Sequence, residues 1–235
     1  MRRLMTAAVL SLGLAMTAAP HLAQAAVYAN RVEITRPAEG TPILVVMPEV
    51  SLGMLTAGGT VEPKEEWSQN TRKYLNDSLA KALQGKKYAT ASTDLAAYED
   101  SQDQQMLKLN DAVTDSIAQN IGLMALPTKT SFDWTLGDGA TGLVPADSAT
   151  PPAYALFVRC KGSWSSGGRG AAFLAAAAFG AAIPMGGQFI TATLVDLKTG
   201  QVVWYQFNMV GMGTDIRTPE GAGTAVDNLF KSLPL

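Results

Sequence analysis

Apolar runs along the chain predict three β-strands before its last third. Residues 42–52 read "PILVVMPEVSL", a continuous run rich in branched side chains, which is typical of a strand buried on both faces. A weaker alternation at 87–93 and a second run at 153–162 predict two further strands. Later in the chain, apolar segments at 188–197 and 201–210 flank a short turn at Lys198, so we expect a β-hairpin there.

Apolar residues spaced three or four apart predict a helix after the first strand. Pro63 suits the first turn of that helix, and the carboxylates of Glu65 and Glu66 face its positive dipole end. Its expected buried face consists of Trp67, Tyr74, Leu75, Leu79, Ala82 and Leu83. This helix should pack one face on a sheet.

Two more helices carry recognisable start signals. Ser101 and Gln104 form a capping-box pair, and Thr218 caps a helix that has Pro219 in its first turn. The face expected for the first is Met106, Leu109, Val113, Ile117 and Ile121. The face expected for the second is Val226, Leu229, Phe230 and Leu233. With these two helices and an alanine-rich one, the order becomes β-α-β-α-β-α-β-β-α.

This alternation predicts an α/β protein with a single mixed β-sheet and helices packed on it. We expect an extended lead at 26–41 and one domain over 42–235, since nothing between them reads as a linker or an internal repeat. Residues 123–153 form a long irregular loop, which is functional or mobile because such loops are uncommon in compact domains. Trp134 in this loop either plugs the core or stacks on a ligand.

The alanine-rich segment 170–187 leaves several readings open. No charge occurs from 170 to 195, but Pro184 ends any helix near Ile183, which leaves about 15 residues, or about 22 Å, too short to cross a bilayer. We favour a closely packed crossover helix over 171–183. A subunit contact or a membrane-surface contact is the alternative, and an anion site at Gly167 to Gly170 with Arg169 is a weaker one.

If part of this segment is exposed, it is the place to look for a partner. The candidate interaction residues are Gly168, Arg169, Phe173, Leu174, Phe179 and Ile183.

The first 25 residues predict a cleaved secretory signal peptide. Two arginines precede a short apolar run, and Ala23, Gln24 and Ala25 form an A-x-A site before Ala26. The run is not followed by a cysteine, so we expect a periplasmic protein that is exported without lipidation. One cysteine, Cys160, cannot form an internal disulfide and reads as a buried, inert thiol.

Composition narrows the chemistry. His21, the only histidine, is lost with the signal peptide, which disfavours histidine-dependent hydrolase sites and the usual zinc sites. Without Arg2 and Arg3 the chain holds 16 basic and 20 acidic residues and no basic block, so nucleic acid is not an expected partner. We expect no catalytic residue, no cofactor and no metal, calcium included.

Carboxylates alone can still do acid-base work, so a cell-wall-active enzyme remains an alternative. The candidate pairs are Glu65 with Glu66, and Asp133 with Asp138. The first pair is also explained by the helix dipole, and the second by turn chemistry.

Several stretches carry a resemblance to known families. They are "VVMPEVSLGMLTAGG", "FDWTLGDG", "ALFVRCKGSWSSGGRGAA" and "ATLVDLKTGQVVWYQFN". Together they resemble an uncharacterised family of proteobacterial periplasmic envelope proteins. More distantly, the arrangement is similar to the α/β domain of curli-secretion channel lipoproteins (CsgG-like), of lipoprotein activators of penicillin-binding proteins (LpoB-like), and of the TolB amino-terminal domain.

This resemblance implies an envelope protein that acts through protein contacts, as an assembly or accessory factor, without catalysis. Its partners would be other envelope proteins, with self-association as a further option. Two features depart from the relatives: the lipidated cysteine is missing, and the alanine-rich region looks helical where the curli channel has membrane strands. A membrane-associated oligomer or secretion-pore component built on 170–187 is therefore the first alternative, and the carboxylate-only enzyme is the second.

Overall fold

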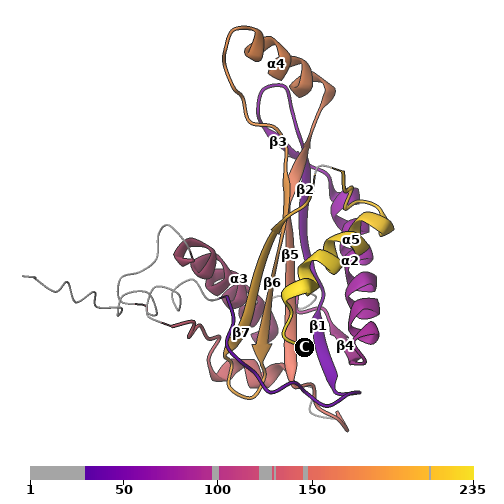
Figure 1. The fold of residues 1–235 in the computed structure, drawn as a ribbon, viewed down its shortest axis with the longest axis vertical. Coiled ribbons are helices and arrows are strands. Elements are labelled where there is room, and N and C mark those ends of the chain that lie inside the picture. Colours follow the sequence, from indigo (N-terminus) through magenta and orange to yellow (C-terminus); the bar gives the residue numbers. More distant parts are fainter. Residues whose placement is uncertain (1–29, 97–100, 122–128, 130, 145–147, 212) are drawn as a thin grey trace, which may run out of the picture.

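A computed structural model describes residues 30–96, 101–121, 129, 131–144, 148–211 and 213–235. The signal peptide, its cleavage site at Ala25 and Ala26, and parts of the predicted loop at 123–153 lie outside these residues. The elements are β1 (Pro42–Val46), β2 (Glu49–Leu55), β3 (Val61–Pro63), α2 (Glu65–Gly85), β4 (Ala89–Thr93), α3 (Gln102–Asn120), η1 (Asp138–Leu143), β5 (Tyr154–Ser165), α4 (Gly167–Ala178), β6 (Gln188–Asp196), β7 (Val202–Met209), α5 (Pro219–Leu229) and η2 (Phe230–Ser232). The predicted α/β class with a single mixed sheet is confirmed (Figure 1).

The strand β5 organises the sheet. β1 and β2 run parallel to it one after the other, β6 runs antiparallel along its other side, and β7 continues beyond β6. β4 lies parallel on the outside of β1. β3 lies antiparallel on the outside of β2, and sequence reasoning missed it because its three residues are all exposed.

The strand predicted over 42–52 is two strands, with Met47 and Pro48 between them. Val45 pairs with Leu156 and Glu49 pairs with Arg159, so four steps along this strand match three along β5. Proline has no backbone N–H to donate to the neighbouring strand, so the ladder of hydrogen bonds is interrupted at Pro48. One extra residue in a strand, a β-bulge, accommodates such an interruption. The pairing then resumes and runs on to Leu55.

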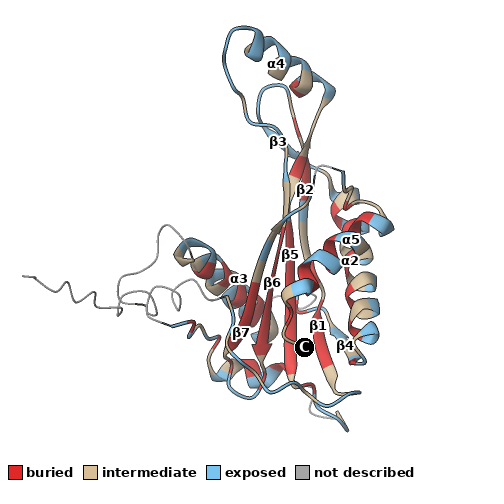
Figure 2. Cartoon of the chain, viewed as in Figure 1, coloured by how far each residue is buried: buried red, intermediate tan, exposed pale blue. Residues whose placement is uncertain are grey.

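One face of the sheet is covered by α2 and α5 (Figures 1 and 2). The expected faces of both helices turn inward, and Thr218 caps α5 by accepting a hydrogen bond from the Gly221 N–H. The largest fully buried side chains on this face are Ile43, Leu75, Leu79, Leu83, Leu156, Ile190, Leu194, Trp204 and Ile216. This is the larger of the two apolar cores.

The other face is covered by α3 and by part of the predicted loop. The loop contains η1, and Trp134 packs partly buried against this second core, in agreement with the plugging hypothesis. The expected face of α3 is partly wrong, because Leu109 is 40% exposed while Leu107 and Asn110 are buried. The helix is rotated so that polar residues, Asn110 and Thr114 among them, also face the sheet.

The alanine-rich helix is not a crossover helix packed on the sheet. α4 lies at the end of an arm in which β2, β3, β5 and β6 extend past the helical layers (Figure 1). Arg169 is the one buried residue of this helix, and the helix ends at Ala178, five residues before the expected Ile183. The packing hypothesis is therefore wrong for most of this segment.

Gly200 in the β6–β7 turn offers a test of the fold. Its φ is +70°, and a Cβ there would lie 2.1 Å from the Gly137 carbonyl oxygen. We expect Gly200→Ala to lower the free energy of unfolding by about 2 kcal/mol or more, since strain and a backbone clash add. Urea unfolding measures this loss.

Gly85→Ala is the matched control, because a Cβ at Gly85 would meet nothing within 4 Å. It should change the free energy of unfolding by less than about 1 kcal/mol. Equal losses for the two variants would contradict the hairpin geometry.

Candidate functional site

The base of the arm is fixed to the body by an aromatic and cationic stack. The guanidinium carbon of Arg217 lies 4.5 Å from the ring centre of Trp67 on α2 and 4.1 Å from that of Trp164 on β5. The two rings meet edge to face at 5.8 Å, and Asp215 accepts hydrogen bonds from Arg217. Such contacts hold the strands of the arm against α2.

The tip of the arm is clamped by Arg169. Its Nε and Nη2 donate to the Pro184 carbonyl oxygen at 3.0 and 2.7 Å, and its Nη1 donates to the Ala57 carbonyl oxygen at 3.3 Å. The residue is 8% exposed. One guanidinium thus joins the start of α4 to the return loop and to the β2–β3 turn, and its donors are used on backbone rather than offered to an anion.

The six candidate interaction residues fall into two groups. Arg169 is buried, Phe173 and Ile183 are half-buried, and Gly168 approaches the side chain of Ala57. Leu174 and Phe179, by contrast, are 70% and 90% exposed. The first group builds the tip, and the second group is available for contact.

The exposed side of α4 is apolar. Ala171, Leu174, Ala175 and Ala178 are exposed at helical spacing. Met185, in the return loop, is 45% exposed. Within the described part of the chain, no helix has both the length and the apolar character needed to cross a membrane.

A second apolar surface lies where β6 and β7 pass the covered part of the sheet. The rings of Phe189 and Phe207 are 5.7 Å apart, and Phe207 and Met209 are 45% and 74% exposed. Phe207 pairs with Thr191 and Met209 with Phe189 in the strand register. We call Phe189, Phe207 and Met209 the strand patch.

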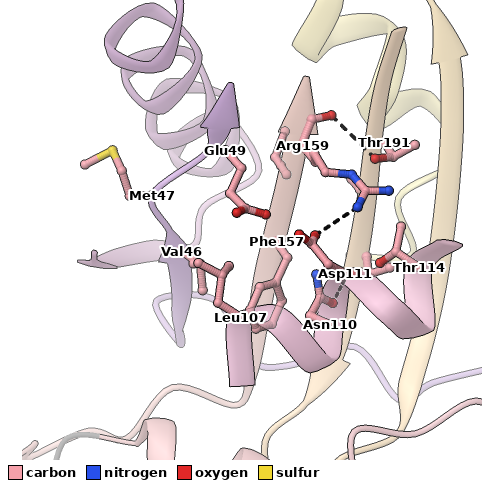
Figure 3. A pocket seen from close by; sticks show the side chains of 13 residues that line it. Val46, Met47, Glu49, Leu107, Asn110, Asp111, Thr114, Phe157, Arg159 and Thr191 are labelled. Carbon is pink, nitrogen blue, oxygen red and sulfur yellow. Dashed lines mark hydrogen bonds and ion pairs between the residues drawn. The ribbon is translucent and has the colours of Figure 1, made fainter. Parts of the chain in front are cut away.

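Beneath α3, a buried arginine lies close to several carboxylates, and Figure 3 shows two of them, Glu49 and Asp111. Arg159 on β5 is 7% exposed and forms ion pairs with Asp111, at 3.0 Å, and with Asp115, both on α3. The helical spacing of four residues places these two carboxylates on one side of α3. The pairs fasten α3 to the centre of the sheet.

Glu49 at the start of β2 is the third carboxylate. Its pKa is raised to about 7, first by burial and then by the neighbouring Asp111, through electrostatic repulsion and a hydrogen bond, and these effects outweigh the lowering by Arg159 and Lys161. An open pocket of about 160 Å³ adjoins the group and is lined by Glu49, Val50, Ser51, Arg72, Asp111, Arg159 and Lys161. The pocket therefore holds charges of both signs.

Sequence reasoning missed this cluster because Arg159 stands inside an apolar strand and Asp111 and Asp115 inside an amphipathic helix. Two signals could have found it: a charge at a buried strand position needs partners, and acidic residues four apart can supply them. Which strand and which helix meet is a property of the fold.

The predicted carboxylate pairs do not form a common site. Glu65 and Glu66 occupy the first turn of α2, as the dipole explanation requires. Asp133 forms an ion pair with Lys129, whereas Asp138 begins η1. Among the described residues, no group of three His, Cys, Asp or Glu side chains could hold a metal ion.

Cys160 lies on β5 in the larger core. Its side chain is fully buried, and burial raises the pKa of the thiol to about 12. A thiol held in the protonated form is a poor nucleophile, in agreement with the inert role expected for it.

The raised pKa of Glu49 predicts a pH dependence of stability. The folded state binds this proton more tightly than the unfolded state, whose carboxyl keeps the ordinary value of 4.5, so stability falls as the pH rises from 4.5 to about 7. Because Glu49 is only half-buried, solvent screening reduces the effect to about 1 kcal/mol. The measurement is urea unfolding across this pH range.

Glu49→Gln should remove this part of the dependence, since the amide does not titrate. Glu66→Gln, at an exposed position on α2, is the control and should leave the profile of the native protein unchanged. If both variants keep the native slope, Glu49 is not the responsible group.

The Arg169 clamp predicts that the tip loosens without it. Arg169→Lys keeps the charge but loses the fork that reaches both Pro184 and Ala57. We expect amide hydrogen exchange over 170–187 to quicken at least about ten-fold, as local opening becomes easier. Arg36→Lys, at an exposed residue of the lead, should leave this exchange unaltered.

Comparison with known proteins identifies no family. No family model matches the sequence, and no curated protein matches it. Solved structures show weak likeness to the fold. Among them are a neuraminyllactose-binding hemagglutinin homologue from Helicobacter pylori (10% identity, 88% of this chain and 91% of that one, TM-score 0.43) and the lipoprotein GNA1162 from Neisseria meningitidis (12% identity, 82% and 97%, TM-score 0.33). Another is the LpoB C-terminal domain from Salmonella enterica (14% identity, 81% and 93%, TM-score 0.29). The third is of the LpoB type named by the sequence resemblance, and the curli-secretion and TolB likenesses stay predictions. Likenesses of this strength say nothing of what the chain binds.

Proposed function

We propose that the protein is a non-catalytic periplasmic envelope protein, an assembly or accessory factor that acts through protein contacts. The observation that carries the proposal is apolar surface left uncovered along the arm and at its base. Export by a cleaved signal peptide, without lipidation, is part of the proposal.

The strand patch is the surface that suits a protein partner. Its rings lie on paired strands, where β-structure holds them in fixed positions, and Met209 beside them is flexible enough to fit a partner's contour. Exposed aromatic and methionine side chains are enriched at protein interfaces. Other envelope proteins are the expected partners, and self-association is a second option.

The arm supports a variant of this function. A membrane-associated oligomer or secretion-pore component would use segment 170–187, and Leu174 and Phe179 are exposed there. A pore would require this segment to cross a bilayer, which a helix of 12 residues is too short to do. Membrane association is therefore the form of this variant that segment 170–187 favours, and the secretion pore stays a prediction.

The carboxylate-only cell-wall enzyme is the remaining candidate, and one observation bears on it. Glu49 and Asp111 do converge beside an open pocket, although neither was a predicted residue. Arg159, which is paired with Asp111 and Asp115, neutralises part of this charge and gives the cluster a structural role. A cell-wall hydrolysis assay that shows activity lost in Glu49→Gln would support the enzyme.

Cross-linking in intact cells tests the proposed contact. A photo-reactive residue introduced in place of Phe207 should yield a discrete cross-linked protein species. Adding Met209→Asp should reduce its yield at least about ten-fold, because an interface does not tolerate an unpaired charge at its apolar centre.

Leu109→Asp is the matched control, since Leu109 is also an exposed apolar residue but lies on α3 and not on the strands of the patch. This variant should keep the cross-linked species. A yield that falls equally in both variants, or no cross-link from the photo-reactive protein that keeps Met209 and Leu109, would contradict the proposal.

A further inference from the structure

We infer that the tip of the arm, α4 with the return loop at 179–187, is a lipid-contacting element that dips into one face of a membrane without crossing it. The inference rests on the proposed function only in placing the protein in the envelope. It assigns the tip to lipid and leaves the strand patch to protein.

The first argument is the distribution of apolar surface. Leu174 is 70% exposed on the outer side of α4, Phe179 is 90% exposed at its end, and Met185 is 45% exposed in the return loop. These three residues belong to different parts of the tip rather than to one stripe of the helix. A groove on a protein covers one side of a helix, whereas lipid surrounds whatever enters it.

The second argument is charge. The sequence holds no charged residue from Gly170 to Val195, and the guanidinium of Arg169 is directed inward onto the carbonyls of Pro184 and Ala57. No charged side chain of α4 after Arg169 or of the return loop therefore has to lose strongly bound water as the tip enters an apolar phase. The Arg169 clamp also satisfies two carbonyl oxygens that would otherwise face that phase.

The third argument excludes a second copy of the tip as the main partner. A helix of 12 residues is about 18 Å long, so one of its sides offers about 300 Å². Two such sides would bury about 600 Å² in total, half of the roughly 1,200 Å² at the low end of stable interfaces. A lipid bilayer is fluid, so contact with it does not require a complementary protein surface of this area.

The length of α4 sets the depth of the contact. About 18 Å falls short of the roughly 30 Å hydrocarbon core, so the tip enters one leaflet only. Because it lacks basic residues, the contact should need neither anionic lipid nor low salt. The strands of the arm, fixed at their base by Arg217, would then hold the body away from the membrane surface.

Vesicle flotation of the purified exported protein tests the inference. The probe is a vesicle of phosphatidylcholine alone, compared with one that also contains phosphatidylglycerol. The native protein should float with both, equally at about 0.05 and 0.5 M salt. Leu174→Asp and Phe179→Asp should each lower the partition coefficient at least about ten-fold, because a charge then replaces a lipid-facing apolar group.

Leu109→Asp carries the same change on α3 and should float like the native protein. Leu174 and Phe179 are exposed, so Leu174→Asp and Phe179→Asp should keep the native unfolding midpoint. An unchanged midpoint shows that a loss of flotation comes from lost binding and not from lost folding. Failure of the native protein to float, or flotation that requires phosphatidylglycerol and disappears in salt, would overturn the inference.

Two readouts separate the remaining partners. If Leu174→Asp converts an oligomer into a monomer in light scattering without vesicles, the tip is a contact between copies and the inference is wrong. If the Phe207 cross-link is lost while flotation persists, the proposed protein contact changes but the lipid inference stands.

Fluorescence quenching by brominated lipid locates the contact directly. The quencher should reach the side chain introduced by Phe179→Trp and should not reach the one introduced by Phe207→Trp.

Discussion

The structure depends on how β5 is paired and covered. This strand of 12 residues is hydrogen-bonded on both sides for most of its length, by β1 and then β2 on one side and by β6 on the other. Its first seven residues are buried, because α2 and α5 cover one face and α3 covers the other. The strands continue past that cover, and the arm is the part of the sheet that is paired but left uncovered.

Two buried guanidiniums stabilise this arrangement, one at the centre of the sheet and one at the tip of the arm. Arg159 forms ion pairs with carboxylates on α3 and so fastens a helix to the sheet, whereas Arg169 donates to backbone carbonyls and so closes the tip. Unpaired burial of either charge would be costly. Each therefore specifies a contact between segments that lie far apart in the sequence.

The two arginines lie in surroundings of different chemical character. Around Arg159 lie charges of both signs, a pocket and a carboxyl group whose pKa is about 7. Around Arg169 the surface is apolar and uncharged. A body whose surface carries charge and an arm whose segment 170–187 carries none can contact two different environments at once, which is a physical basis for the proposed accessory role.

Most of the elements follow from the sequence alone, because local periodicity, capping residues and turn residues act over a few positions; the exposed β3 and the break between β1 and β2 do not. The sequence yielded all four long helices, the hairpin at Lys198 and the mixed sheet, and the cap at Thr218 lies where expected. Only the tertiary structure decided what α4 touches, since an apolar run looks the same whether it is buried in a core or exposed on an arm. Likewise, Glu49, Asp111, Asp115 and Arg159 lie on three separate elements, and no local pattern brings them together. Burial and the meeting of distant residues are set by which strands pair with β5 and by how far the helices cover them.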